Sequence, residues 1–116
     1  MKKTLNCHLL QSTPTETDIV PATDRFIEVK TLVDESHIIR RILKCKECEQ
    51  LYLYEFYEEI DWAEGNDPQY RTFVPVETVE KAEIMNKIYK PGFITALPRL
   101  QFDFLQNGTK TIAWFR

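Results

Sequence analysis

Residues 43–62, LKCKECEQLYLYEFYEEIDW, place a Cys-x-x-Cys pair directly before a run of aromatic and acidic residues. Apolar residues precede the pair at Ile38–Ile39 and Ile42–Leu43, and an alternating run follows it. The residues between Cys45 and Cys48 are polar, as expected for an exposed tip. This order predicts a strand, a tight turn and a second strand, around which we expect the rest of the chain to be arranged.

The spacing of the two cysteines favours a metal site. Two thiolates separated by two residues can hold one tetrahedral zinc ion at about 2.3 Å each. Cys7 is the only other thiol in the chain, so we expect the N-terminus to fold back and supply it. A strand leading into Cys45 would put His37 roughly 26 Å away. A helix would still leave about 12 Å. We therefore predict one structural zinc ion held by Cys7, Cys45, Cys48 and His8, with His37 in reserve.

This segment resembles one half of a zinc ribbon over about residues 37–62. Lys46 and Glu49 stand where that family commonly has a proline after the first Cys and a glycine after the second. The resemblance implies a structural zinc site and, by association, nucleic-acid binding. A small basic group does lie here, at Arg40, Arg41, Lys44 and Lys46.

Three other interpretations of the cysteines remain open. A redox pair needs a thiol activated at a helix N-terminus, whereas the residues after Cys48 predict a strand. A disulfide needs an oxidising compartment, whereas three cysteines are an odd number and no secretion signal is visible. The third interpretation is that the cysteines bind nothing and only pack.

Length and composition predict one soluble domain spanning residues 1–116. Hydrophobic residues at 43% are ordinary for a folded globule of this size. The start Met1–Lys3 leads into polar sequence, so we expect no signal peptide, and no apolar run is long enough to span a membrane. A cytoplasmic location follows as an expectation.

Charge is unevenly distributed along the chain. The net charge is −3, yet residues 47–70 contain eight acidic residues and neither Lys nor Arg. Such a segment repels nucleic acid and favours a basic partner.

The chain as a whole predicts an α+β fold: an antiparallel sheet with one packed helix and a zinc-knuckle-like turn. Loop-like composition marks residues 1–24 as an N-terminal arm, and strands with the knuckle occupy 25–62. Residues 25–33 alternate cleanly, whereas 37–45 fit a helical stripe or a strand, of which we favour the strand. Residues 70–76 return as a strand, with Pro75 at a strand end or edge.

The C-terminal third predicts a helix and a hairpin. Residues 78–89 form the helix, with Thr78 as its N-cap and Pro91-Gly92 as its stop. Residues 100–115 form the hairpin, with Asn107-Gly108 at a type I′ turn. The expected buried stripe of the helix is Val79, Ala82, Met85, Ile88 and Tyr89.

The strand predicted over residues 50–62 carries the candidate binding surface. Alternation puts Leu51, Leu53, Glu55, Tyr57, Glu59 and Asp61 on one face. The other face is more apolar, so we expect it to point inward and leave an acidic row outside. We predict that a basic protein binds at Glu55, Tyr57, Glu59 and Asp61, as basic nuclease toxins are bound by small acidic immunity-type inhibitors. The chain is then a non-enzymatic, zinc-stabilised interaction module.

An enzymatic alternative uses the same row. Carboxylates two residues apart on a strand lie about 7 Å from each other, a distance that two-carboxylate hydrolysis can use. A small metal-dependent hydrolase, with a hard cation at Glu59, Asp61 and Asp67, is therefore the competing hypothesis. No Gly-rich phosphate loop accompanies it.

Overall fold

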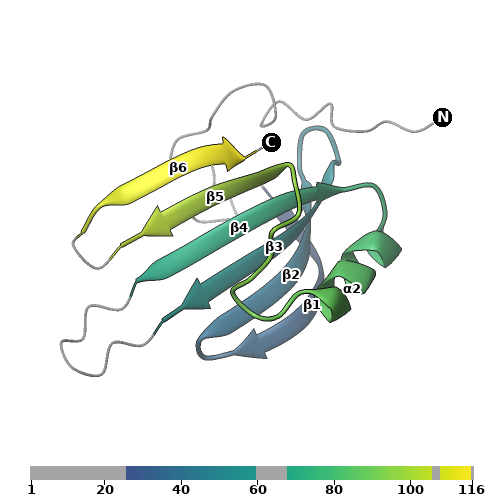
Figure 1. Cartoon of the computed structure of the whole chain (residues 1–116). Helices are drawn as coiled ribbons and strands as arrows, with labels where there is room; N and C mark the ends of the chain where they lie inside the picture. The colour runs from purple at the N-terminus through teal and green to yellow at the C-terminus, as the bar shows by residue number, and fades with distance from the viewer. Residues whose placement is uncertain (1–25, 60–67, 106–107, 116) are drawn as a thin grey trace.

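The computed structural model describes residues 26–59, 68–105 and 108–115. Within these residues, six strands form one antiparallel sheet in chain order, and one helix lies between the fourth and fifth strands in the sequence (Figure 1). The predicted α+β class, with a helix packed on an antiparallel sheet, is confirmed. The elements are β1 Phe26–Glu35, β2 Ile38–Cys45, β3 Leu51–Glu58, β4 Gln69–Val76, α2 Val79–Ile88, β5 Arg99–Phe104 and β6 Lys110–Phe115.

The first hairpin settles the ambiguous segment before the cysteines in favour of a strand. β2 is paired along its length with β1 and β3. Its β-branched residues are therefore in a strand and not in a helix. The alternation expected in β1 is wrong, however, because its register slips between Glu28 and Lys30 and between Thr31 and Val33. Bulges of this kind blunt the free edge of a sheet.

Backbone hydrogen bonds close the turn that carries the Cys-x-x-Cys pair. Cys45 N donates to Gln50 O and Glu49 N donates to Cys45 O, each at 2.9 Å. Glu49 adopts a φ of 66°, which lets the chain enter β3. The predicted order of strand, turn and strand is therefore confirmed.

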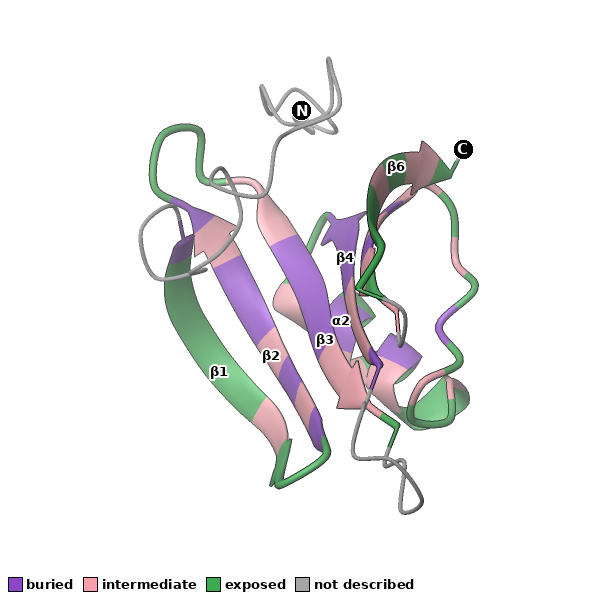
Figure 2. Ribbon diagram, turned by 90° about the vertical axis from the view of Figure 1, so that its left-hand side faces the viewer, coloured by how far each residue is buried: buried purple, intermediate pink, exposed green. Residues whose placement is uncertain are grey.

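Both faces of the sheet are buried at its centre (Figure 2). The expectation that only one face of β3 points inward is wrong, because α2 covers the other face. Beneath α2 the core consists of Ile42, Leu53, Val74, Val76, Ala82, Met85 and Ile94. The opposite face packs Phe26, Leu43, Cys45, Tyr52, Tyr54, Phe73, Leu100 and Phe102.

The helix forms where its capping residues predict it. The Thr78 hydroxyl accepts from Lys81 N at 3.0 Å, and Ala82 and Met85 are buried. The prediction that Ile88 is buried is wrong, because this residue is 65% exposed. It lines an open groove of about 530 Å³ between the helix and residues 96–98. Among the described residues, no helix has both the length and the apolar character needed to traverse a bilayer.

The C-terminal hairpin forms as predicted, with a different turn. Leu105 N donates to Thr109 O at 2.8 Å and Gly108 N donates to Leu105 O at 3.0 Å. Positions 106–108 therefore separate the bonded pair, whereas a type I′ turn leaves two residues. Gly108 supplies the left-handed conformation, with φ 86°. Asn107 lies outside the described residues.

Pro75 lies at a strand end, as predicted. β4 pairs with β5 only from Gln69 to Phe73, so the position without an N–H lies beyond that ladder.

Candidate functional site

Glu55 does not belong to an exposed row. Its side chain lies beneath the helix, and the residue is only 2% exposed. Its Oε2 accepts from Arg40 Nε at 2.8 Å and from Gly92 N at 3.0 Å. The predicted exposure of Glu55 is therefore wrong, because alternation reports which face a residue shares and not whether another element covers that face.

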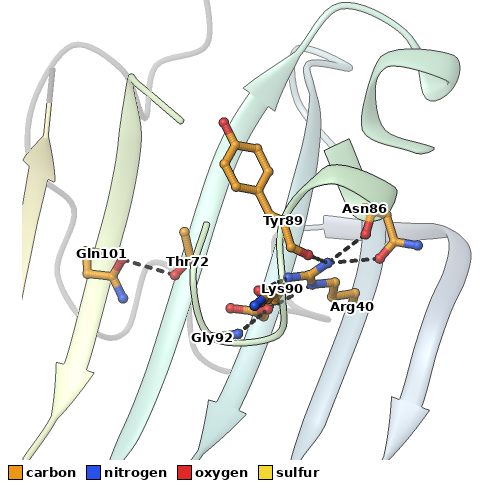
Figure 3. Close-up of polar contacts among 8 residues, drawn as sticks. Arg40, Thr72, Asn86, Tyr89, Lys90, Gly92 and Gln101 are labelled. Carbon is orange, nitrogen blue, oxygen red and sulfur yellow. Dashed lines mark hydrogen bonds and ion pairs between the residues drawn. The ribbon is translucent and has the colours of Figure 1, made fainter. Parts of the chain in front are cut away.

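Arg40 connects β2 to the end of the helix (Figure 3). The residue is 1% exposed, and its Nη1 donates to the carbonyls of Asn86 and Tyr89 at 3.0 and 2.8 Å. Its Nη2 donates to Lys90 O at 2.8 Å. The last carbonyls of a helix have no partners within the helix and carry partial negative charge, so a cation stabilises them. The Arg40–Glu55 pair thus fixes the helix and the following loop on the sheet.

One register row further along, the helix face of the sheet carries a different polar group. Tyr57, Tyr70 and Asp103 are consecutive cross-strand neighbours on β3, β4 and β5. The two tyrosine rings stack with centroids 6.3 Å apart. Glu59, which follows β3 directly, is exposed. We call Tyr57, Glu59, Tyr70 and Asp103 the acidic edge.

Burial shifts the pKa values of two members of this group. The pKa of Tyr70 is raised, first by desolvation and then by the negative charges of Glu59 and Asp103. Its hydroxyl therefore remains a protonated donor at neutral pH. Desolvation also raises the pKa of Asp103, against a hydrogen bond from Gln101 and the charge of Arg99. The acidic edge can therefore offer carboxylates, phenol groups and ring faces to a cation.

The predicted binding residues are only partly brought together. Tyr57 and Glu59 belong to the acidic edge, whereas Glu55 belongs to the buried pair and Asp61 lies outside the described residues. The hydrolase hypothesis loses Glu55, which is paired with Arg40 and enclosed, whereas its Glu59–Asp61 pair lies partly outside the described residues and stays a prediction. Asp67, its third proposed cation ligand, is also outside the described residues.

The predicted zinc ligands are described only in part. Cys7 and His8 lie outside the described residues, Cys45 is buried in the core, and Cys48 is exposed in the turn. His37 precedes β2, at the end of that strand opposite to Cys45, and its Nδ1 lies 3.8 Å from Glu58 Oε1. It is therefore too far from Cys45 to serve as the reserve ligand. Across residues 26–59, 68–105 and 108–115, no three His, Cys, Asp or Glu side chains converge to hold a metal.

The sequence did not identify Arg40 as part of a buried ion pair, nor Asp103 as part of the acidic edge. The signal for Arg40 was its position between Ile38 and Ile42, on one face of a predicted strand. A charge on an apolar strand face requires a buried partner, but only the register with β3 identifies that partner as Glu55. Asp103 had no local signal, because its neighbours in the group come from β3 and β4.

Comparison of the chain with protein-family models, curated proteins and solved structures finds no match.

Proposed function

We propose that this protein is a non-enzymatic interaction module that binds a basic protein at its acidic edge. The observation that carries the proposal is the placement of Asp103 across from Tyr70, and of exposed Glu59 two positions after Tyr57, beside the stacked rings of the two tyrosines. A lysine or arginine of a partner would meet carboxylates and aromatic faces together. An inhibitor of a basic enzyme, such as an immunity-type protein, would use this surface.

The physical chemistry of the acidic edge suits recognition. Carboxylates steer a positively charged partner over distances of about a Debye length, roughly 8 Å at physiological salt. Tyrosine adds ring area for cation–π contact and a hydroxyl that donates or accepts. Aromatic residues of this kind are enriched at protein interfaces.

The acidic sequence between β3 and β4 begins and ends at the acidic edge. Glu59 N donates to Pro68 O at 3.0 Å, so the chain leaves and re-enters the described structure there. The sequence between them contains Asp61, Glu64 and Asp67, which lie outside the described residues. Both flanks of this acidic stretch therefore adjoin Tyr57 and Tyr70.

A titration with a defined cationic probe tests the proposal. A short Lys/Arg peptide is added to ¹⁵N-labelled protein and followed by NMR, with its Lys/Arg residues replaced by Gln in a control peptide. We expect saturable shifts at Tyr57, Glu59, Tyr70 and Asp103 that weaken as salt rises. The double variant Glu59→Lys/Asp103→Lys should weaken binding by about tenfold or more, equivalent to about 1.4 kcal/mol.

A charge reversal elsewhere is the matched control. Glu80 is exposed in the first turn of α2, so Glu80→Lys changes the net charge without touching the acidic edge. It should leave affinity within about twofold. The single variant Glu59→Lys changes the net charge by the same amount as Glu80→Lys. Equal loss of affinity in these two single variants would mean that only net charge matters, and would overturn the proposed site.

The zinc ion held by Cys7, Cys45, Cys48 and His8 remains a separate prediction, as does the cytoplasmic location. The described structure contributes Cys45 and Cys48 at the two ends of one turn. Elemental analysis of purified protein should find one zinc per chain, lost in Cys48→Ser. Metal-free protein with an unchanged melting temperature would contradict the zinc prediction and leave the acidic edge untouched.

A further inference from the structure

The sheet face opposite α2 carries an arginine that lies over two aromatic rings. Arg71 on β4 lies in register between Phe56 on β3 and Phe102 on β5. Its guanidinium carbon is 5.0 Å from the centroid of the Phe56 ring and 5.6 Å from that of Phe102. Stacking on two rings restrains the planar guanidinium group, so less entropy is lost when it binds an anion.

A second arginine and a buried hydroxyl adjoin this position. Arg41 on β2 is the cross-strand neighbour of Tyr54 on β3, one register row from Arg71. Tyr54 is only 8% exposed. Burial raises the pKa of its hydroxyl, opposed by the charges of Arg71 and Arg41 and by a hydrogen bond with Arg71. Tyr54 thus lies on the strand between those that carry the two arginines, on the same face of the sheet as both.

The two cations are incompletely neutralised within the described part of the chain. Arg41 Nε is buried without a hydrogen-bond acceptor, and the nearest carboxylate oxygen, Glu28 Oε1, is 3.7 Å away. Among the described residues, no carboxylate lies within ion-pair distance of Arg71, whose guanidinium carbon lies over the rings of Phe56 and Phe102. Glu28 offsets part of the charge of Arg41, and a bound anion would balance the positive charge that remains on the two guanidinium groups.

We propose that Arg41, Tyr54 and Arg71 form a binding site for a phosphate group, either free or carried by a nucleotide. A phosphate near neutral pH carries between one and two negative charges, which matches two arginines better than a monovalent carboxylate does. Its several acceptor oxygens fit two guanidinium forks and a phenol hydroxyl. This site lies on the face opposite the acidic edge and does not depend on it.

Arginine side-chain NMR with inorganic phosphate tests the site directly. The Nε–Hε resonances of Arg41 and Arg71 should shift saturably at constant ionic strength, whereas acetate should shift them weakly. Arg41→Gln and Arg71→Gln should each weaken phosphate binding by about tenfold. Arg41 is partly exposed, so its variant keeps the test valid if Arg71→Gln fails to fold.

Arg99 is the matched control. It also stacks on a ring, with its guanidinium carbon 4.7 Å from the Phe115 centroid, but it lies outside the Arg41–Arg71 group. Arg99→Gln should leave phosphate affinity unchanged. AMP binding tighter than inorganic phosphate would assign the site to a nucleotide, and equal binding would assign it to free phosphate. Absence of a saturable shift, or equal shifts at Arg99, would overturn the proposal.

Discussion

Two glutamates four positions apart illustrate how differently this chain uses the same side chain. Glu55 lies on β3 beneath the end of the helix, where Arg40 and Gly92 N occupy its carboxylate. Glu59 follows the same strand and is exposed beside Tyr70. The position of the helix decides which one stabilises the fold and which one can meet a partner.

The largest expected effect is on the buried pair. Arg40→Met leaves the Glu55 carboxylate enclosed without its cation and removes the donors from the helix end. We expect a loss of about 3–5 kcal/mol in the free energy of unfolding, measured by urea denaturation.

The double variant Arg40→Met/Glu55→Leu provides the control. Removing both charges should cost less than Arg40→Met alone, because no buried charge is left uncompensated. A double variant as unstable as the sum of the two single variants would mean that the pair itself does not couple the two residues.

The next largest effect on the free energy of unfolding is expected from the contact between the helix and the sheet. Met85 is buried against the core, so Met85→Ala should cost about 2–5 kcal/mol. Ile88→Ala removes a side chain of similar size from an exposed position and should stay within about 0.5 kcal/mol. Similar costs for the two substitutions would contradict the observed face of α2.

Gly92 lies between the buried Arg40–Glu55 pair and the acidic edge. Its N–H donates to Glu55, and a Cβ built on it would lie 3.0 Å from the Tyr57 ring. With φ at +82°, Gly92→Ala should cost about 1–3 kcal/mol from the backbone alone, and the contact with Tyr57 should add to this.

Gly108 separates these two contributions. It has a φ of +86°, and nothing lies within 4 Å of its added Cβ. Gly108→Ala should therefore cost less than Gly92→Ala in the same urea experiment. Equal costs would show that the Tyr57 ring moves aside without a penalty.

The smallest effect concerns pH dependence at the acidic edge. Because the pKa of Asp103 is raised in the folded protein, its ionisation opposes folding. That penalty is absent below the unfolded pKa near 3.8 and complete once the pH exceeds the folded pKa. Asp103→Asn should therefore melt at a higher temperature than the parent protein at neutral pH.

The difference between Asp103→Asn and the parent should shrink on acidification. Arg99 and Gln101, which face Asp103, are present in both proteins and do not titrate in this range. A stability difference that grows below pH 3.8 would contradict the assigned direction of the shift.

Sequence patterns predicted where the strands and the helix lie better than they predicted which of their residues are buried. Caps and breakers located α2 and the C-terminal hairpin because these signals act between near neighbours. The period of residues 37–45 was ambiguous, and their β-branched content favoured the strand that forms β2. The burial of Glu55 depends on a helix that begins more than twenty positions later, and the exposure of Ile88 depends on where that helix rests. Neither is encoded in the local alternation.

The acidic edge could be predicted only in part for the same reason. Tyr57 and Glu59 stood out in the acidic strand, whereas Tyr70 and Asp103 join them through register with β4 and β5. Residues distant in sequence become neighbours only once pairing is known.

The most direct test measures stability and affinity on the two glutamates together. Glu55→Gln should lower the unfolding free energy by about 3–5 kcal/mol, because Arg40 loses its counter-charge, and the folded fraction should bind the Lys/Arg peptide as the parent protein does. Glu59→Gln should change stability by no more than about 0.5 kcal/mol and should weaken peptide binding. Weakened binding in folded Glu55→Gln, with normal binding in Glu59→Gln, would contradict the division of roles between them.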